Sequence, residues 1–349
     1  MEKTNIKIIS SEALSAWCSE HSVPAFRIRQ INDWLWKKGV RSFEEMRNLP
    51  QSFIALLQSS FYIGVVVVEV RQSSSDGTEK ISFKLEDGAM VEGVLIPSGE
   101  RTTACISTQA GCALCCAFCA TGQAGFVRDA LGWEIFDQVF SLNVMSLEKT
   151  GHKLNNIVFM GMGEPFLNYE NTASSLRMLI DPEYGFGFSP QRITVSTSGI
   201  PEGIRRFAED FPKVQLAVSL HSARQEKREE LMPVAKKHSL EDLSAALVDY
   251  HNTTSGRIII EYILLDNVND SERDAHELAR FCRSFPVKVN LICFNNIKES
   301  MFHSSGHEKT HTFVSILSEK NMLVQVRKSM GTDIDAACGQ LAKKSNTNN

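Results

Sequence analysis

The amino-acid sequence predicts an α/β protein whose main part is an open (β/α)6 barrel with parallel strands. Three observations favour this fold class. From residue 101 onward, six apolar segments of strand length alternate with segments of helical length and period. A helical region precedes them, and short β-branched segments with Asp-Gly turns lie between the two. The same order also suits a doubly wound sheet, and in either architecture chemistry is expected at the carboxyl ends of the strands.

We expect four regions along the chain, namely a helical N-terminal domain, an antiparallel β extension, the barrel and a C-terminal segment: residues 1–60, 61–97, 98–335 and 336–349. In the first region, Phe26, Ile31 and Leu35 have roughly helical spacing. In the second, β-branched runs end at turn signals, as strands of a small antiparallel sheet do. The last region carries Cys338 and a polar tail that is expected to fray.

The barrel elements are assigned from their apolar patterns and lengths. The predicted strands of the extension and then of the barrel are residues 65–70, 81–85, 91–96, 103–107, 156–160, 192–196, 214–220, 257–265 and 287–294. The clearest helical segments between the barrel strands are residues 131–147, 240–250 and 271–285.

The composition is that of an ordinary globular protein, with 43% hydrophobic and 22% charged residues among 349. No apolar run is long enough to span a membrane, and residues 1–10 contain no signal-peptide core, so we expect a cytoplasmic protein. The net charge of −4 neither indicates nor excludes an RNA partner. Five of the nine cysteines lie between Cys105 and Cys119, which indicates a metal site or thiol chemistry.

The strongest motif is the cysteine loop at residues 111–122, directly after a predicted strand. Cys112, Cys116 and Cys119 have the C-x3-C-x2-C spacing. A [4Fe–4S] cluster bound only by protein takes four thiolates, so three thiolates leave one iron open to a ligand. That iron can chelate the amino and carboxylate groups of S-adenosylmethionine (SAM), whose reductive cleavage gives a 5′-deoxyadenosyl radical.

The sequence offers two alternatives to this ligand set. Cys115 would give a C-x2-C-x3-C spacing in place of Cys116, but Phe118 directly before the last cysteine fits the familiar form of the motif with Cys116. A zinc site would normally use a second cysteine pair, and the sequence contains no second C-x2-C.

A SAM pocket is predicted at the ends of the following strands. Residues 156–165 form an apolar strand that ends in Gly161-Met-Gly163-Glu164-Pro165, where glycine lets the backbone approach a ligand and Glu164 can bind the SAM ammonium. Polar groups at later strand ends are expected to hold the carboxylate, ribose and adenine of SAM, and the predicted contacts are Gly163, Glu164, Ser196, Ser219, Leu220, His221 and Asn295.

The sequence resembles the RlmN family of radical SAM RNA methyltransferases, which is related to the Cfr group. The motifs that carry the resemblance run in order from about residue 24 to 341. Besides the Cys112/Cys116/Cys119 motif they are Cys105-Ile-Ser-Thr-Gln-Ala-Gly-Cys, Gly161-Met-Gly-Glu-Pro, Ser196-Thr-Ser-Gly, Ser219-Leu-His, Leu231-Met-Pro and Asp333-Ile-Asp-Ala-Ala-Cys-Gly-Gln-Leu. The sequence departs from the family after Asn295, where a proline-containing stretch is expected, and at Cys115, which is commonly polar.

The resemblance implies a radical SAM partial barrel that methylates carbon 2 of adenosine in 23S ribosomal RNA, at the peptidyl transferase centre, and next to the anticodon of transfer RNA. It implies that Cys338 carries the methyl group, that Cys105 resolves a covalent protein–RNA adduct, and that Glu92 is the base. Two SAM molecules would be used per turnover. An electron donor such as flavodoxin and a disulfide reductant would be needed, and we expect a monomer without a membrane partner.

Three other functions would also use parts of this sequence pattern. A Cfr-type enzyme would methylate adenine carbon 8, but Pro165 after Gly-Met-Gly-Glu favours the RlmN side. An activase that makes a glycyl radical would have no use for the Cys105 and Cys338 pair. An iron–sulfur electron carrier would need neither the glycine–glutamate turn nor a barrel of this size.

Overall fold

The structure is a computed structural model that describes residues 3–297 and 300–341. Of the polar tail expected to fray, residues 340–349, the part from 342 onward lies outside the described residues, as do residues 298–299 of the segment after Asn295. Gln340 is described, and its Nε2 donates to the Asn296 carbonyl at 2.9 Å. Within the described ranges, no helix is long and apolar enough to cross a membrane.

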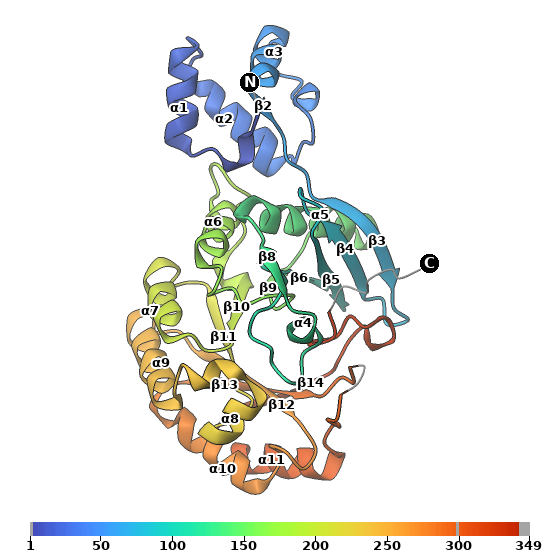
Figure 1. Cartoon of the computed structure of the whole chain (residues 1–349), viewed down its shortest axis with the longest axis vertical. Helices are drawn as coiled ribbons and strands as arrows, with labels where there is room; N and C mark the ends of the chain where they lie inside the picture. Colours follow the sequence, from blue (N-terminus) through green and yellow to red (C-terminus); the bar gives the residue numbers. More distant parts are fainter. Residues whose placement is uncertain (1–2, 298–299, 342–349) are drawn as a thin grey trace.

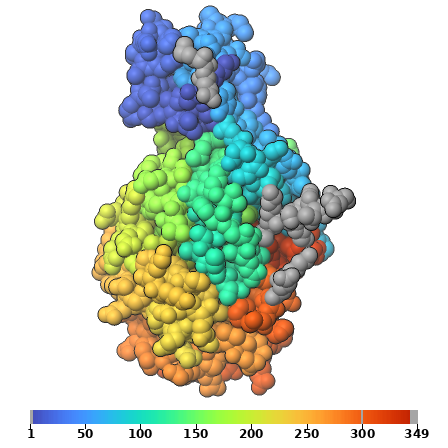
Figure 2. All heavy atoms as spheres, in the orientation of Figure 1, coloured from blue at the N-terminus to red at the C-terminus, as the bar shows by residue number. Residues whose placement is uncertain are grey.

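A helical region forms the N-terminal end of the molecule. Its helices are α1 (Ser11–Glu20), α2 (Phe26–Asn32) and α3 (Gln51–Ser60), and the two-residue strand β1 (Thr4–Asn5) pairs in parallel with β2 (Phe61–Tyr62). Ser10 caps α1, because its hydroxyl accepts a hydrogen bond from the Ala13 N–H. The apolar side chains of this region form a hydrophobic cluster separate from the main core. The region is therefore a distinct lobe (Figures 1 and 2).

One ten-stranded sheet makes up the main body. In spatial order from the C-terminal edge its strands are β14 (Leu323–Arg327), β13 (Val287–Cys293), β12 (Ile258–Leu264), β11 (Gln215–Ser219), β10 (Ile193–Thr197), β9 (Asn156–Phe159), β6 (Arg101–Cys105), β5 (Met90–Ser98), β4 (Glu79–Lys84) and β3 (Val67–Ser73). All neighbours from β6 to β14 are parallel, and those from β3 to β6 are antiparallel.

The strand order decides between the two predicted architectures. A doubly wound sheet reverses its strand order at a switch point, whereas here the parallel strands follow one another in chain order. The expected open α/β barrel is therefore confirmed. The sheet differs from the prediction in two details. The antiparallel extension continues the barrel sheet through the pairing of Val94 with Cys105, and β14 adds a seventh parallel strand.

The strand β14 was missed because it is a short edge strand whose side chains are mostly exposed, so its apolar signal is weak. The longer helices line the outer side of the curved sheet (Figure 1). They are α5 (Gly132–Thr150), α6 (Tyr169–Ile180), α7 (Pro201–Asp210), α9 (Leu240–Thr254), α10 (Glu272–Phe281) and α11 (His307–Glu319). Two short helices, α4 (Ala120–Gln123) and α8 (Gln225–Leu231), follow strand ends instead.

Candidate active site

A cavity of about 280 Å³ opens at the carboxyl ends of the parallel strands. It is lined by the cysteine loop, by the ends of β9 to β12 and by the C-terminal segment. Ten of the residues predicted from the sequence contribute to its wall: Cys105, Cys112, Cys116, Cys119, Gly163, Glu164, Ser196, Ser219, His221 and Cys338. The chain therefore brings together motifs that lie far apart in the sequence.

Three predicted residues lie outside this wall. Leu220 is completely buried in the core, and its N–H donates a hydrogen bond to the Glu261 carbonyl. Asn295 lies next to the cavity and donates from Nδ2 to the Cys338 carbonyl at 3.3 Å. Glu92 lies on β5, two residues before Val94, which pairs with Cys105, so Glu92 and Cys105 project to the same face of the sheet.

The cysteine loop is held by a short hairpin. Strands β7 (Gln109–Gly111) and β8 (Phe126–Asp129) pair antiparallel on either side of it. Gly111 has a positive φ of 80°, and a Cβ there would overlap the Gly125 carbonyl, so only glycine fits where the loop begins. At the other end of the loop, the Ala117 N–H donates to the Leu231 carbonyl of α8 at 3.0 Å.

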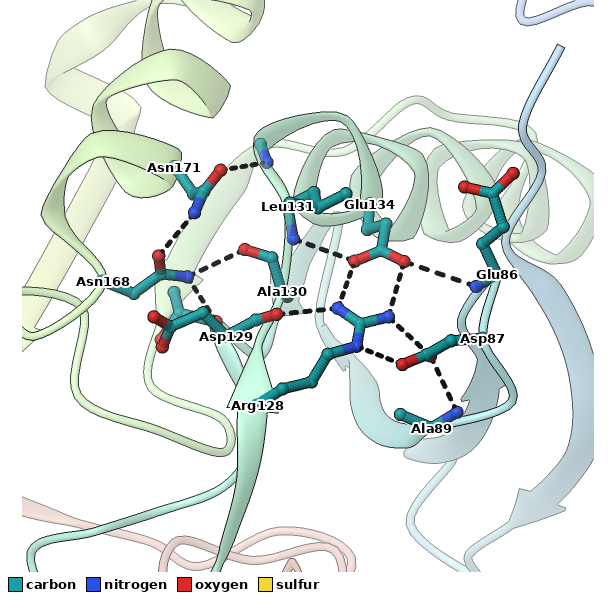
Figure 3. A network of polar contacts seen from close by, with 12 residues as sticks. Glu86, Asp87, Ala89, Arg128, Asp129, Ala130, Leu131, Glu134, Asn168 and Asn171 are labelled. Atoms are coloured by element: carbon teal, nitrogen blue, oxygen red, sulfur yellow. Dashed lines mark hydrogen bonds and ion pairs between the residues drawn. The ribbon is translucent and has the colours of Figure 1, made fainter. Parts of the chain in front are cut away.

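An ionic network fastens this hairpin to the rest of the protein (Figure 3). The Arg128 guanidinium of β8 donates to Glu134 in the first turn of α5 at 2.7 and 2.8 Å. It also donates to Asp87 in the turn between β4 and β5, with both hydrogen bonds at 2.7 Å. Glu134 is completely buried, so this bidentate pair neutralises a carboxylate that would otherwise be costly to bury.

The three motif thiols are close enough to influence one another. Burial raises the pKa of Cys112 to about 11, and negative charge on Cys119 adds to this effect. Burial likewise raises the pKa of Cys116, with contributions from Cys112 and Cys119. In the described part of the chain, no three His, Cys, Asp or Glu side chains converge tightly enough to hold a single metal ion. The thiols still fit an iron–sulfur cluster, because each thiolate binds a different iron atom.

The neighbouring Cys115 is placed differently. Its φ is +52°, its side chain is exposed, and its thiol donates to the Ala113 carbonyl at 3.6 Å. It does not contribute to the cavity wall, whereas Cys116 does.

Glu164 organises the opposite wall of the cavity. Its Oε1 accepts hydrogen bonds from the Phe166 N–H at 3.0 Å and the Thr197 hydroxyl at 2.7 Å, and its Oε2 accepts from the Ser198 N–H at 2.7 Å. Burial raises the pKa of this carboxyl group. Both oxygens are thus engaged within the protein, and the carboxylate ties the end of β10 to the glycine turn. Thr197 and Ser198 also line the cavity, although the sequence analysis named only Ser196 from this motif.

His221 contributes an uncharged ring. Its Nδ1 accepts a hydrogen bond from the Ile263 N–H at 3.0 Å, so the neutral ring carries its proton on Nε2. Burial lowers the pKa of His221 to about 3, and the positive charge of Arg228 lowers it further. Phe118 of the cysteine loop packs edge-on against the ring at 4.7 Å between centroids. At neutral pH the ring therefore offers a hydrogen-bond donor and an aromatic face.

Cys105 and Cys338 face the same cavity, and neither forms a disulfide in this structure. Cys105 is buried at the end of β6. Burial raises the pKa of its thiol, and negative charge on Cys338 raises it further. Surrounding protein atoms raise the pKa of Cys338 as well, although its side chain is open to the cavity.

The C-terminal loop, residues 331–339, is anchored at both ends. The Gly331 N–H donates to Asp76 at 2.8 Å, and Asp333 accepts from the Ser75 N–H at 3.0 Å. At the other end, the Gly339 carbonyl accepts from the Ala120 N–H at 2.8 Å. These contacts hold Cys338 over the cavity.

The structure also identifies a buried acid that the sequence analysis did not select. Glu261 of β12 lines the cavity and accepts a hydrogen bond from Asn290 at 2.8 Å. Burial raises the pKa of Glu261, and its negative charge contributes to the raised pKa of Cys338. A single acidic residue within the apolar run 258–264 was the available signal.

Comparisons with known proteins give concordant results. Residues 106–279 match the family model of the radical SAM superfamily, and residues 4–63 match that of the ribosomal RNA large subunit methyltransferase N-terminal domain. The probable dual-specificity RNA methyltransferase RlmN of Christiangramia forsetii is 44% identical over 98% of this chain and 97% of its own length. The protein of the same name from Flavobacterium johnsoniae is 42% identical over 99% of this chain and 98% of its own length. The crystal structure of a radical SAM methyltransferase from Sphaerobacter thermophilus superposes with a TM-score of 0.91 at 38% identity, covering 97% of this chain and 99% of that one.

Proposed function

The chain belongs to the RlmN family of radical SAM RNA methyltransferases, and from this premise we propose that it methylates carbon 2 of adenosine. The proposed substrates are an adenosine in the peptidyl transferase centre of 23S ribosomal RNA and one next to the anticodon of transfer RNA. The observation that carries this proposal is the pair Cys105 and Cys338 in one cavity with Cys112, Cys116 and Cys119. Methyl transfer through a protein thiol needs such a pair, whereas a radical SAM enzyme without a covalent intermediate does not.

The proposed cofactor site is a [4Fe–4S] cluster bound by Cys112, Cys116 and Cys119, with SAM between the cluster and the ends of β9 to β13. When bound, the cluster and SAM together supply a hydrogen-abstracting radical. Ser196, Ser219 and the Nε2–H of His221 offer hydrogen-bonding groups for SAM, and Gly163 contributes to the cavity wall. Glu164 holds that wall in shape through its hydrogen bonds to Thr197 and Ser198.

Methylation of adenine carbon 2 requires an unusual route. This carbon is electron-poor, so it cannot attack the methyl group of SAM as a nucleophile. In the proposed sequence, the Cys338 sulfur first takes a methyl group from one SAM. After loss of one hydrogen atom from that S-methyl group, its carbon bonds to carbon 2 of the base and joins Cys338 to the RNA.

Two further residues complete the proposed turnover. Glu92 removes the proton from carbon 2, and the adduct also gives up its unpaired electron, which the proposed cluster would accept. The Lys80 ammonium lies 3.8 Å from the Glu92 carboxylate. Cys105 then attacks the Cys338 sulfur, so that a sulfur–sulfur bond forms, the carbon–sulfur bond breaks and the carbon receives a proton. The product is methyladenine and a Cys105–Cys338 disulfide, which a thiol reductant must reduce before the next turnover.

We propose that the N-terminal region recognises RNA by shape, with a basic group as its contact surface: Arg27, Arg29, Lys37, Lys38 and Arg41. The target adenosine must leave its stack to reach a cavity at the strand ends. A small electron-transfer protein such as flavodoxin would supply electrons. We expect a monomer.

The test compares the two cysteine variants. Cys338→Ala should form no S-methylcysteine and should leave RNA unmodified. Cys105→Ala should proceed to the covalent adduct and stall there, because the carbon–sulfur bond forms before Cys105 is needed. Denaturing gel electrophoresis of protein purified from cells, with and without ribonuclease, would show RNA attached to Cys105→Ala alone.

Two results would contradict the proposal. One is a Cys105→Ala variant that carries no RNA and remains fully active. The other is a product that mass spectrometry of digested RNA identifies as 8-methyladenosine, which would make the chain a carbon-8 enzyme.

A further inference from the structure

Arg228 is an arginine whose charge is completely buried. It lies on α8, and none of its side chain is exposed to solvent. Its Nη2 donates to the Ser198 carbonyl at 2.5 Å. Its Nε and Nη1 have no hydrogen-bond partner within residues 3–297 and 300–341. Burial lowers the pKa of Arg228 to about 10, so the side chain is still a cation at neutral pH.

A buried cation needs an anion nearby. Burying a charge without a partner is strongly unfavourable, and buried arginines are normally paired with carboxylates. No carboxylate among the described residues forms an ion pair with Arg228, although eighteen such contacts join other side chains. Among the residues that the structure describes, two donor nitrogens of this guanidinium therefore have no acceptor, and no carboxylate is paired with it.

The surroundings of Arg228 point to the cysteine loop. The helix α8 contacts that loop directly, because the Leu231 carbonyl accepts a hydrogen bond from the Ala117 N–H at 3.0 Å. Ala117 follows Cys116, which lines the cavity. Met232, whose N–H donates to the Arg228 carbonyl, lines the cavity.

The other side of Arg228 leads to Glu164. Ser198 accepts a hydrogen bond from Arg228 through its carbonyl and donates its own N–H to Glu164. At Gly199, which has a φ of +96°, an added Cβ would lie 3.0 Å from the Arg228 Nη2. Glycine at this position therefore gives the guanidinium room to lie behind the cavity wall.

We propose that Arg228 is the buried counter-charge of the iron–sulfur cluster, acting on it from the side of Cys116. This inference rests on the proposed cluster site and concerns a positioning residue that need not touch the substrate. Three thiolates make the cluster region negative, and an added electron makes it more so. A positive charge held in a poorly polarisable interior stabilises the reduced cluster and thereby raises its reduction potential. The motif Leu231-Met-Pro, which begins at the last residue of α8, then serves to hold this charge against the cysteine loop.

The test is the reduction potential of the reconstituted, full-length protein, followed by electron paramagnetic resonance of the reduced cluster. Arg228→Gln removes the charge but keeps an amide donor, and Arg228→Lys keeps the charge. We expect Arg228→Gln to lower the ratio of reduced to oxidised cluster about tenfold at the wild-type midpoint potential. That change corresponds to about 59 mV for a one-electron couple. Arg228→Lys should retain most of the wild-type potential.

Arg224→Gln is the matched control. Arg224 precedes the same helix but pairs with Asp274 at 3.4 Å and does not line the cavity. Its replacement should leave the potential unchanged. An unchanged potential in Arg228→Gln, or equal shifts in the Gln and Lys variants, would overturn the counter-charge role.

Thermal unfolding with and without the cluster gives a second readout. If Arg228 is a counter-charge, Arg228→Gln should destabilise the cluster-loaded protein relative to wild type and spare the cluster-free protein. Iron retained by Arg228→Lys but lost from Arg228→Gln would support the same role. Equal destabilisation of both forms would mean that Arg228 only supports Ser198, and so would contradict the inference. Absence of any cluster in the wild type would instead contradict the proposed function.

Discussion

Two consecutive cysteines in the loop at residues 112–119 have opposite surroundings. Cys115 adopts a left-handed backbone conformation, with φ at +52°, and its side chain is exposed. Cys116 lines the cavity, and burial together with the charges of Cys112, Cys119 and Arg228 affects the pKa of its thiol. Since consecutive residues in a tight loop point in different directions, only one of the two can face the position that Cys112 and Cys119 share.

This difference predicts separate outcomes for the two alanine variants. Cys116→Ala should lose nearly all iron after anaerobic reconstitution, as should Cys112→Ala and Cys119→Ala. Cys115→Ala should keep the iron content of the wild type, because its sulfur lies outside the cavity wall. Iron and sulfide analysis with the absorbance spectrum is the measurement. Iron loss in Cys115→Ala with retention in Cys116→Ala would reverse the ligand assignment.

At the scale of elements, the β7–β8 hairpin supports the cysteine loop that it flanks. Arg128 joins this hairpin to α5 through Glu134 and to the β4–β5 turn through Asp87 (Figure 3). On the other side, Asn168 donates from Nδ2 to the carbonyls of Thr108 and Ala130, both at 2.8 Å. Contacts from three elements thus fix the position of the loop, which holds its thiols beside the strand ends.

The Asp87–Arg128 pair predicts a pH-dependent contribution to stability. Hydrogen bonds from Arg128 lower the pKa of Asp87 to about 2, below the value of about 3.9 for an unfolded aspartate. A depressed folded pKa means that the pair stabilises the fold above about pH 4 and that this contribution is lost as the pH falls toward 2. The Asp87 side chain is 55% exposed, so we expect Asp87→Asn to lower the free energy of unfolding by less than about 1 kcal/mol at pH 7.

Urea unfolding of wild type and Asp87→Asn from pH 7 to pH 3 checks this prediction. The difference between the two proteins should be constant above about pH 5 and should shrink below about pH 4. Asp249→Asn, which removes an exposed carboxylate paired with Arg205 at 2.7 Å, controls for the general effect of removing a surface charge. A difference for Asp87→Asn that is the same at every pH would show that its ion pair does not contribute.

At the scale of the whole molecule, the helical lobe is attached to the barrel by a buried ion pair. Lys7 donates to both carboxylate oxygens of Asp137 on α5 at 2.8 Å, and 3% of its side chain is exposed. Its ammonium also lies 5.2 Å from the ring centre of Trp133. The lobe has its own hydrophobic cluster, so it can hold its shape. The ion pair, the edge-on contact of Trp36 with Phe136 of α5 at 5.2 Å and the chain connection set where it attaches.

This arrangement predicts that the lobe and the barrel can be separated in function. Deletion of residues 1–63, combined with Asp137→Asn so that no buried charge is left unpaired, should abolish RNA methylation. The cluster and the reductive cleavage of SAM should persist, because no described residue of the cavity wall lies before Ile96. Cutting after residue 63 also keeps β3 and β4, which belong to the main sheet. Liquid chromatography of 5′-deoxyadenosine and of RNA nucleosides measures both activities.

Two outcomes decide this last prediction. Full RNA methylation by the truncated protein would mean that the lobe does not recognise RNA. Loss of SAM cleavage together with the cluster would mean that the lobe supports the barrel rather than the substrate. The full-length Asp137→Asn protein is the matched control for the substitution at the interface.

The sequence by itself determined the features that are encoded locally. Strands such as β9 and β12 carry apolar runs, and Cys112, Cys116 and Cys119 lie in one loop, so periodicity and spacing were sufficient to predict them. The family resemblance supplied the expected roles of Cys105 and Cys338, which no local pattern contains.

Only the tertiary structure decided which distant residues meet. The pairing of β5 with β6 merges the extension with the barrel, and the edge strand β14 depends on β13 for its hydrogen bonds. The buried guanidinium of Arg228 could not be recognised from the sequence, because burial is set by packing between elements. Long-range hydrogen bonding and the burial of charge are properties of the assembled fold, and here they determine how the cavity is built.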